Sequence, residues 1–171
     1  MKLILSPGYS KTEVFETVKT FLEYHHFKII NSDETRPWGG FYVIDESQSQ
    51  EFIDFFFKDV PGSKGESSGK LSPKILLVES GKRLSWQYHH RRAEIWKVIA
   101  GEVGVVTSDD DKEGVLQTKK TGDIIILKKG ERHRLIGTTG WGILAEIWQH
   151  TDINYPSDEE DIVRVQDDFG R

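Results

Sequence analysis

Short, β-branched apolar runs fill the chain from Lys74 to Trp148. Turn signals separate these runs, among them Ser80-Gly81, Ala100-Gly101 and Lys129-Gly130. Many short strands at this spacing predict an all-β sandwich or barrel rather than alternating β-α-β units. The predicted strands are Ile75–Val78, Leu84–Tyr88, Ile95–Ala100, Val103–Thr107, Val115–Gln117, Ile124–Leu127, His133–Ile136 and Ile143–Trp148.

Residues 1–35 are predicted to form a helix-and-strand extension that packs on the barrel. Ser10 and Glu13 make a capping-box pair, so a helix is expected over residues 10–22, where apolar side chains recur on one face. We expect this helix to lie against the barrel, and a dimer-interface helix or a lid is the alternative. Phe27–Ile30 is predicted to be a short strand that extends one sheet.

Residues 36–171 are predicted to be the barrel domain, with an insertion at about residues 46–70. Residues 50–57 are dense in phenylalanine and predict a helical turn or two, while residues 61–69 have the composition of a flexible loop. An exposed aromatic cluster of this size would favour aggregation. We therefore expect it to cover a barrel end or a subunit contact.

Four side chains with metal-binding atoms are predicted to face the barrel interior. Gln87 and His89 lie two residues apart, on the same face of one predicted strand, and Glu94 begins the next strand. His133 follows a tight turn in the hairpin at residues 122–137. Imidazole and carboxylate ligands suit zinc, and the same donor set accepts iron, nickel or manganese. The alternative is a set of hydrogen-bonded polar groups in a barrel mouth.

These residues resemble the double signature of the cupins, which are small metal-binding β-barrels. The first signature reads G-x5-H-x-H-x4-E-x6-G, and the second contains a proline, a glycine, a histidine and an asparagine after its first glycine. The matching positions are Gly81, His89, Glu94, Gly101, Gly122, Gly130 and His133. Three positions depart from the signatures: Gln87 replaces a histidine, Lys128 the proline and Gly137 the asparagine.

Residues 84–96 narrow the resemblance, because LSWQYHHRRAEIW is similar to the motif of type II mannose-6-phosphate isomerases. Residues 36–39 and 161–171 agree with the same group, so the resemblance covers about residues 36–171 apart from the insertion. It implies a cupin jelly-roll barrel that interconverts mannose 6-phosphate and fructose 6-phosphate. The open alternatives are an isomerase of another sugar or sugar phosphate, and a non-catalytic cupin module that binds a sugar or a metal.

The resemblance also implies site residues. The expected cofactor is one divalent metal, zinc first, with manganese, nickel, iron or cobalt as alternatives, on Gln87, His89, Glu94 and His133. The candidate catalytic residues are Lys74, Arg92 and Glu94, and the proton-transferring base is left open between Lys74, Glu94 and a hydroxide held by the metal. The candidate substrate-binding residues are Arg36, Ser85, Arg134, Arg164 and Arg171, since cations must hold the phosphate.

Composition restricts the partners. A net charge of −5 argues against a general nucleic-acid binder, because binding to a phosphate backbone needs a basic face. No apolar run approaches the roughly 20 residues that span a bilayer, and the apolar stretch at the N-terminus is too short for a secretory signal. Cysteine is absent. We therefore expect a cytoplasmic protein. The resemblance implies a small sugar phosphate as its ligand and is compatible with a homodimer.

Overall fold

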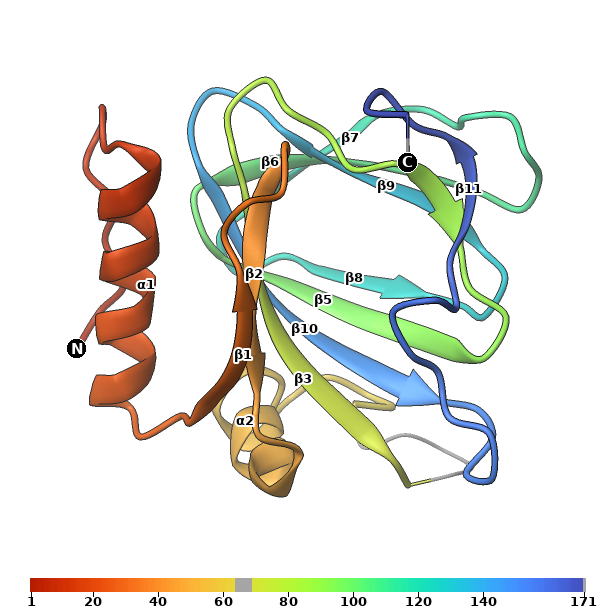
Figure 1. Ribbon diagram of the computed structural model, residues 1–171, viewed down its shortest axis with the longest axis horizontal. Coiled ribbons are helices and arrows are strands. Elements are labelled where there is room, and N and C mark those ends of the chain that lie inside the picture. The colour runs from red at the N-terminus through yellow and green to blue at the C-terminus, as the bar shows by residue number, and fades with distance from the viewer. Residues whose placement is uncertain (64–68, 171) are drawn as a thin grey trace.

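The computed structural model describes residues 1–63 and 69–170, and their strands form two antiparallel sheets (Figure 1). The six-stranded sheet has the order β1-β2-β3-β10-β5-β8, and the five-stranded sheet has the order β11-β4-β9-β6-β7. The strands are β1 (Ile29–Asp33), β2 (Gly39–Ile44), β3 (Leu71–Val78), β4 (Trp86–Tyr88), β5 (Arg92–Ala100), β6 (Glu102–Ser108), β7 (Gln117–Lys120), β8 (Ile124–Leu127), β9 (Arg132–Gly137), β10 (Gly142–His150) and β11 (Val163–Gln166). This architecture confirms the all-β, jelly-roll expectation.

Two apolar clusters lie on opposite faces of the six-stranded sheet. Side chains such as Leu76, Trp96 and Leu144 face the five-stranded sheet and fill the barrel interior. Their neighbours along the strands, such as Ile75 and Ile147, point to the other face and pack against the helices. Because both faces of β3 and β10 are covered, these strands are apolar along nearly their whole length, as expected for buried strands. A polar residue within them therefore stands out.

Two helices cover the outer face of the six-stranded sheet. Helix α1 (Lys11–Tyr24) begins with the predicted capping box between Ser10 and Glu13, so that expectation is confirmed. The predicted insertion contains a short 3-10 helix, η1 (Glu46–Gln48), followed by α2 (Ser49–Phe56). Phe52 and Phe56 of α2 pack into the cluster on the outer face of the six-stranded sheet, so they cover this face rather than a barrel end, while Phe55 is exposed. A role at a subunit contact stays a prediction. No helix in the described ranges is long and apolar enough to cross a membrane.

Two predicted strands are shifted. The strand expected at Phe27–Ile30 lies at Ile29–Asp33, because Phe27 is buried in the helical cluster. The strand expected at Val115–Gln117 begins only at Gln117, and Val115 is 84% exposed. Here Glu113 pairs with the buried guanidinium of Arg134, and residues 109–116 form no strand.

The C-terminal segment folds back onto the barrel. After β10 the chain runs along one end of the sandwich to β11, which pairs with β4 on the five-stranded sheet (Figure 1). We call residues 151–170 the tail. The acidic composition of this segment suggests disorder in isolation, but its pairing confirms the expectation that it returns to the fold. The tail therefore connects the two sheets beside the strands that carry the predicted ligands.

Candidate metal centre and substrate pocket

The structure brings together three of the predicted ligands. His89 directly follows β4, Glu94 lies in β5 and His133 lies in β9. One potential ligand atom from each residue lies within 4.8 Å of the other two, and all three side chains are buried. Glu94 stands between the imidazoles, with Oε1 3.3 Å from Nε2 of His89 and Oε2 3.6 Å from Nε2 of His133. The side-chain alternation inferred from the sequence therefore places these groups together.

Hydrogen bonds orient both imidazoles in the same way. Nδ1 of His89 is 2.5 Å from the carbonyl oxygen of Asp161, and Nδ1 of His133 is 2.9 Å from that of Glu131. A carbonyl oxygen only accepts, so each Nδ1 carries the hydrogen and each Nε2 presents a lone pair. Nε2 of His133 is buried and makes no hydrogen bond in the described part of the chain. This is the arrangement that metal-binding histidines adopt.

The charge states of these residues also fit a divalent cation. Burial lowers the pKa of His89 to about 3 and also lowers the pKa of His133, so both rings are neutral near pH 7. Burial opposes ionisation of Glu94, but His89 in its protonated form and the guanidinium of Arg92 lower the pKa of this carboxyl below its usual range. Two neutral imidazoles and one carboxylate form a donor set that suits zinc and related metals.

Gln87 lies next to this set, as predicted, but its amide is turned. Oε1 accepts a hydrogen bond from Oγ of Ser85 at 2.5 Å, and Nε2 is 3.5 Å from Nε2 of His89. Because a serine hydroxyl can donate or accept, a half-turn of the amide keeps a hydrogen bond to Ser85. The same half-turn directs Oε1 toward the histidines. Gln87 therefore fits the predicted role of a fourth ligand.

Arg92 joins the ligand set to the tail. Its Nε donates to Oε1 of Glu94 at 2.7 Å, and Nη2 is 3.0 Å from Nε2 of His89. On the other side, Nη1 donates to Oγ of Ser157 at 2.8 Å. The guanidinium also lies over the ring of Trp148, with its central carbon 3.5 Å from the ring centroid. With these contacts Arg92 is buried and held in one position, where it fixes the orientation of Glu94.

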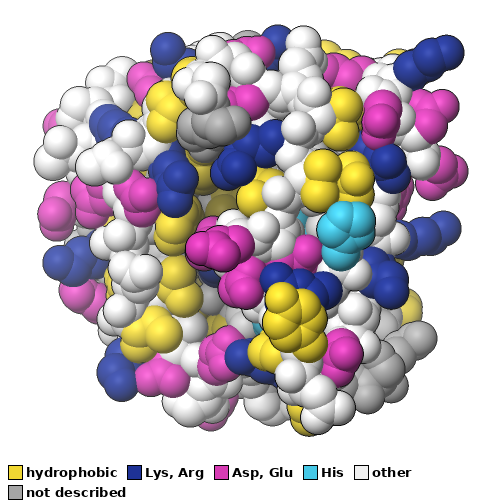
Figure 2. Space-filling model, turned by 45° about the vertical axis from the view of Figure 1, so that its right-hand side comes forward, with side chains coloured by type: hydrophobic (Ala, Val, Ile, Leu, Met, Phe, Trp, Pro, Cys, Tyr) yellow, Lys and Arg dark blue, Asp and Glu magenta, His cyan; other side chains and the backbone are white. Residues whose placement is uncertain are grey.

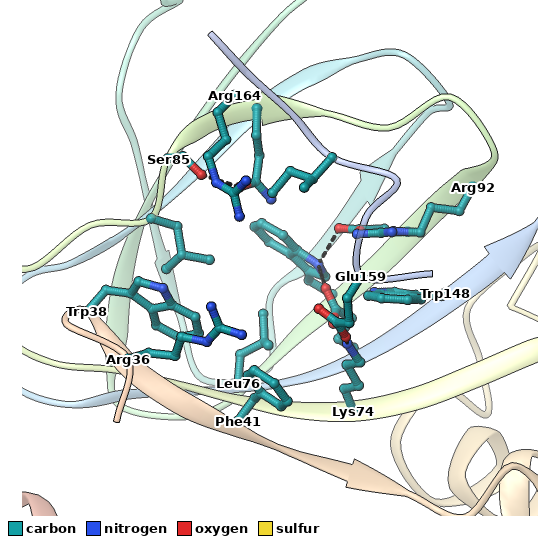
Figure 3. A pocket seen from close by; sticks show the side chains of 16 residues that line it. Arg36, Trp38, Phe41, Lys74, Leu76, Ser85, Arg92, Trp148, Glu159 and Arg164 are labelled. Carbon is teal, nitrogen blue, oxygen red and sulfur yellow. Dashed lines mark hydrogen bonds and ion pairs between the residues drawn. The ribbon is translucent and has the colours of Figure 1, made fainter. Parts of the chain in front are cut away.

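A cavity of about 180 Å³ opens beside His89, Glu94 and His133, which we call the ligand set (Figure 3). Arg36 and Arg164 point into it from different sides, and Lys74 meets Glu159 at a third side. Aromatic rings complete the lining, including those of Trp38, Phe41, Trp96 and Trp148. Figure 2 shows basic and acidic side chains next to hydrophobic ones around a hollow on this side of the molecule. Aromatic faces and arginines are the groups expected for an anionic sugar.

The other sequence-predicted residues separate into two groups. Lys74, Arg36, Ser85 and Arg164 all line the cavity. Lys74 makes an ion pair with Glu159, and its Nζ lies 3.6 Å from the ring centroid of Trp148.

Arg134 does not line the cavity, in contrast to its predicted role in substrate binding. Because side chains alternate along β9, His133 faces the ligand set and Arg134 points to the opposite side. There its guanidinium donates to Glu113 and to the carbonyl oxygen of Gln166. Arg171 lies outside the described residues.

Three residues of the pocket were not predicted from the sequence. Glu146 and Trp148 of β10 and Glu159 of the tail all line the cavity. Glu146 had a recognisable signal, since it is a single carboxylate inside the apolar strand Gly142–His150. Glu159 had none, because it lies in a uniformly acidic segment.

Comparisons with known proteins agree with this geometry. Residues 63–167 match the family model described as the C-terminal domain of mannose-6-phosphate isomerase. The chain is 31% identical over 137 residues to the xanthan biosynthesis protein XanB of Xanthomonas campestris, covering 80% of this chain and 23% of that protein. It is 31% identical over 136 residues to the alginate biosynthesis protein AlgA of Pseudomonas aeruginosa, covering 80% of this chain and 22% of that protein.

The chain thus spans less than a quarter of the length of these two relatives. Among solved structures, vicilin of Corylus avellana superposes with a TM-score of 0.53 at 16% identity, covering 81% of this chain and 34% of that one. This likeness concerns the fold alone. The family match extends over most of the barrel and includes all three metal-binding candidates. The chain therefore belongs to the family of mannose-6-phosphate isomerase C-terminal domains and has the jelly-roll fold of the cupins.

Proposed function

We propose that this protein is a metal-dependent isomerase that interconverts an aldose phosphate and a ketose phosphate, with mannose 6-phosphate and fructose 6-phosphate as the expected pair. One observation carries the proposal: the buried His89, Glu94 and His133 set lies beside a cavity lined by cations and aromatic rings. Family membership agrees with it, and two relatives are named for the biosynthesis of the polysaccharides xanthan and alginate.

The metal would be held by His89, Glu94 and His133, with Gln87 as a fourth ligand. Zinc is the first expectation, and manganese, nickel, iron and cobalt are the alternatives. When bound, such a cation supplies Lewis acidity, which polarises a carbonyl oxygen and stabilises the negative charge of an enediolate. The unpartnered Nε2 of His133 and the matching tautomers of both histidines are the features that support this assignment.

The pocket residues have separate tasks in this proposal. Arg36 and Arg164 bind the phosphate, because a planar guanidinium can donate two parallel hydrogen bonds to phosphate oxygens. The rings of Trp38 and Trp148 pack against the sugar and exclude water. Arg92 is a positioning residue that fixes Glu94 through its 2.7 Å contact. Its Nη2 lies 3.0 Å from Nε2 of His89, which carries the lone pair, and a bound cation would replace this second contact. Together these groups would hold the sugar phosphate in the cavity beside the metal ligands.

The test is an isomerisation assay with mannose, glucose and heptose phosphates on protein stripped of metal and then loaded with zinc, manganese, nickel, iron or cobalt. We expect interconversion with mannose 6-phosphate only in loaded protein. The His133→Ala variant should lose tight metal binding, measured by calorimetry, together with turnover. His90→Ala is the matched control, because His90 is exposed and is not among the ligand candidates. Turnover by metal-free His133→Ala protein would contradict the proposal.

A second candidate is a non-catalytic module that binds a sugar phosphate and a metal. The partial match to longer relatives favours this candidate. The chain spans only 27% of the length of the guanylyltransferase ManC of Salmonella typhimurium, so it need not share the whole activity of that protein. Incubation with substrate in deuterated water separates the two candidates. An isomerase exchanges the hydrogen at C1 or C2 of the sugar, whereas a binding module binds metal and sugar without exchange.

A further inference from the structure

Glu146 is a buried carboxylic acid on the wall of the cavity, and it is not one of the proposed metal ligands. It is 4% exposed and lies in β10, where its neighbours across the sheet are Lys74 of β3 and Trp96 of β5. Its Oε1 accepts a hydrogen bond from Nε1 of Trp96 at 2.9 Å. Its Oε2 makes no hydrogen bond to the described residues, although Glu146 lines the cavity. One carboxyl oxygen is therefore anchored and the other is available to a bound molecule.

The other groups that could exchange a proton with a sugar are already engaged. Glu94 accepts from Nε of Arg92 at Oε1 and from Nε1 of Trp96 at Oε2, at 2.7 Å and 3.1 Å. Lys74 is ion-paired with Glu159, and an ion-paired ammonium has no lone pair to accept a proton. The carboxylate of Glu159 is 59% exposed and is used by this pair. Among the described acids of the cavity, Glu146 alone combines a buried side chain with an oxygen that makes no hydrogen bond.

The electrostatic surroundings of Glu146 suit reversible proton transfer. The charged groups that face it are Glu94 and Arg92 from β5 and Lys74 from β3. Beyond Lys74, Glu159 of the tail supplies a further carboxylate. Burial raises the pKa of Glu146 to about 8, and the charge of Glu94 acts in the same direction, while Lys74 and Arg92 oppose it. Because Glu94 is one of the proposed metal ligands, the contribution of burial is the one that carries over to the metal-loaded protein, and burial favours a carboxyl that can hold a proton.

A single indole anchors both carboxyl groups. Nε1 of Trp96 lies 2.9 Å from Oε1 of Glu146 and 3.1 Å from Oε2 of Glu94, so it holds the two acids on either side of one N–H group. Glu94 is directed toward the imidazoles by Arg92, whereas Glu146 lies beside Lys74. The structure thus gives two carboxyl groups with different surroundings, and such pairs divide charge stabilisation from proton transfer.

We propose that Glu146 carries the proton between C1 and C2 of the bound sugar phosphate, an inference that rests on the isomerase function proposed above. In the aldose-to-ketose direction, the Glu146 carboxylate takes the proton from C2. The electron pair of the C2–H bond forms the C1=C2 double bond, and the carbonyl π pair moves onto O1. The same carboxyl then returns its proton to C1, where a C–H bond forms from the C1=C2 pair. The hydroxyl proton of O2 is transferred to O1, and C2=O is left.

The deciding experiment compares wild-type protein and Glu146→Gln, both loaded with the metal that supports turnover. Glutamine keeps the shape and the oxygen that accepts from Trp96, but it cannot take up a proton. We expect kcat to fall by about 10²–10⁴-fold, the range typical of a lost acid–base catalyst. Exchange of the C2 hydrogen with deuterated water should disappear as well. Metal content, KM and the near-ultraviolet circular dichroism should stay as in wild type.

Glu113→Gln is the matched control, because it removes a carboxylate that contacts a buried arginine outside the cavity. It should retain wild-type kcat and exchange. If wild type isomerises and Glu146→Gln keeps kcat within tenfold, or loses its metal, the role of Glu146 is overturned and the isomerase function stands. If wild type binds metal and sugar phosphate but neither isomerises nor exchanges hydrogen, the proposed function fails, and the role of Glu146 fails with it.

Discussion

Asp161 fastens the tail to the ligand set through both its backbone and its side chain. Its carbonyl oxygen accepts from Nδ1 of His89, which fixes the tautomer of that ligand. Its carboxylate accepts from the backbone nitrogens of His90 and Arg91, at 3.0 Å each, and from Oγ of Ser157 at 2.6 Å. A single residue of the tail therefore determines both the turn after His89 and the direction of its lone pair.

His150 is a third buried imidazole, at the end of β10 and outside the cavity. Its Nδ1 accepts from the backbone nitrogen of Ser157 at 2.9 Å, and its Nε2 lies 2.7 Å from Oγ of Ser72. Burial lowers the pKa of His150 to about 4, and the charge of Lys70 adds to this. Below pH 6.5 the unfolded chain therefore binds a proton at this position that the folded chain does not bind. The contribution of His150 to stability is lost as the pH falls from about 6.5 to about 4.

The first prediction is that His150→Gln weakens the pH dependence of stability in metal-free protein. Between about pH 6.5 and 4, the slope of the free energy of unfolding should decrease by up to the value for one proton, ~1.4 kcal/mol per pH unit. The measurement is urea unfolding at half-unit pH steps. His89, whose pKa is also lowered, remains in both proteins and provides the residual slope. Parallel curves for the two proteins would contradict the prediction.

The predictable part of the site follows from side-chain alternation along strands. His89, Glu94 and His133 were placed correctly because spacing in the sequence determines the face of a strand, and the signature motifs determine which strands meet. Glu146 was missed because its position depends on which strand lies beside β5, and that strand is β10, about 50 residues later along the chain. Sequence spacing contains no information on such a long-range pairing.

At the scale of elements, Gly137 shows why this chain departs from the cupin signature. Gly137 ends β9, and its backbone is hydrogen-bonded to Gly81 and Lys82 of the facing turn. A Cβ atom at residue 137 would lie 1.9 Å from the carbonyl oxygen of Glu79. The close approach of that turn therefore excludes the asparagine of the signature.

The second prediction is that Gly137→Asn destabilises the protein by about 1–3 kcal/mol, because the turn at residues 79–82 must move to accept a side chain. Chemical denaturation of the two proteins gives this difference directly. Gly140→Asn is the control, since nothing lies within 4 Å of a Cβ atom built at Gly140. Equal free energies of unfolding for Gly137→Asn and wild type would contradict the prediction, because the turn would then move without destabilising the protein.

Element boundaries were less predictable than the elements themselves. The helix predicted over residues 10–22 is present as Lys11–Tyr24, because its capping box and apolar stripe are local signals. The strand predicted to begin at Val115 begins only at Gln117. A local apolar run contains no information about the pairing of Glu113 with Arg134. Tertiary contacts of this kind decide where a strand at a sheet edge begins.

At the scale of the whole molecule, the ligand set connects parts of the chain that are far apart. His89 and His133 belong to the five-stranded sheet and its end, Glu94 belongs to the six-stranded sheet, and the tail contributes Asp161. A cation bound at this point would link both sheets. Binding to the folded state alone stabilises a protein by mass action.

The third prediction is that removing metal with a chelator lowers the melting temperature of the wild-type protein. Free metal at 100 times its Kd would stabilise the fold by about 2.7 kcal/mol. Differential scanning calorimetry with and without chelator measures the effect. His133→Ala should melt at the same temperature in both conditions, whereas the control His90→Ala should respond as wild type does. A chelator response that persists in His133→Ala would place the metal elsewhere.

The tail also determines when during synthesis the centre can be completed. Asp161 is translated 72 residues after His89, which corresponds to several seconds at rates of about 5–20 residues per second. In the last part of that interval, once His133 has been translated, a nascent chain has both histidines and Glu94, but it lacks the carbonyl that fixes the tautomer of His89. The proposed ligands are therefore synthesised before their orienting partner, and a cation would meet the complete set of ligands only after the tail has docked.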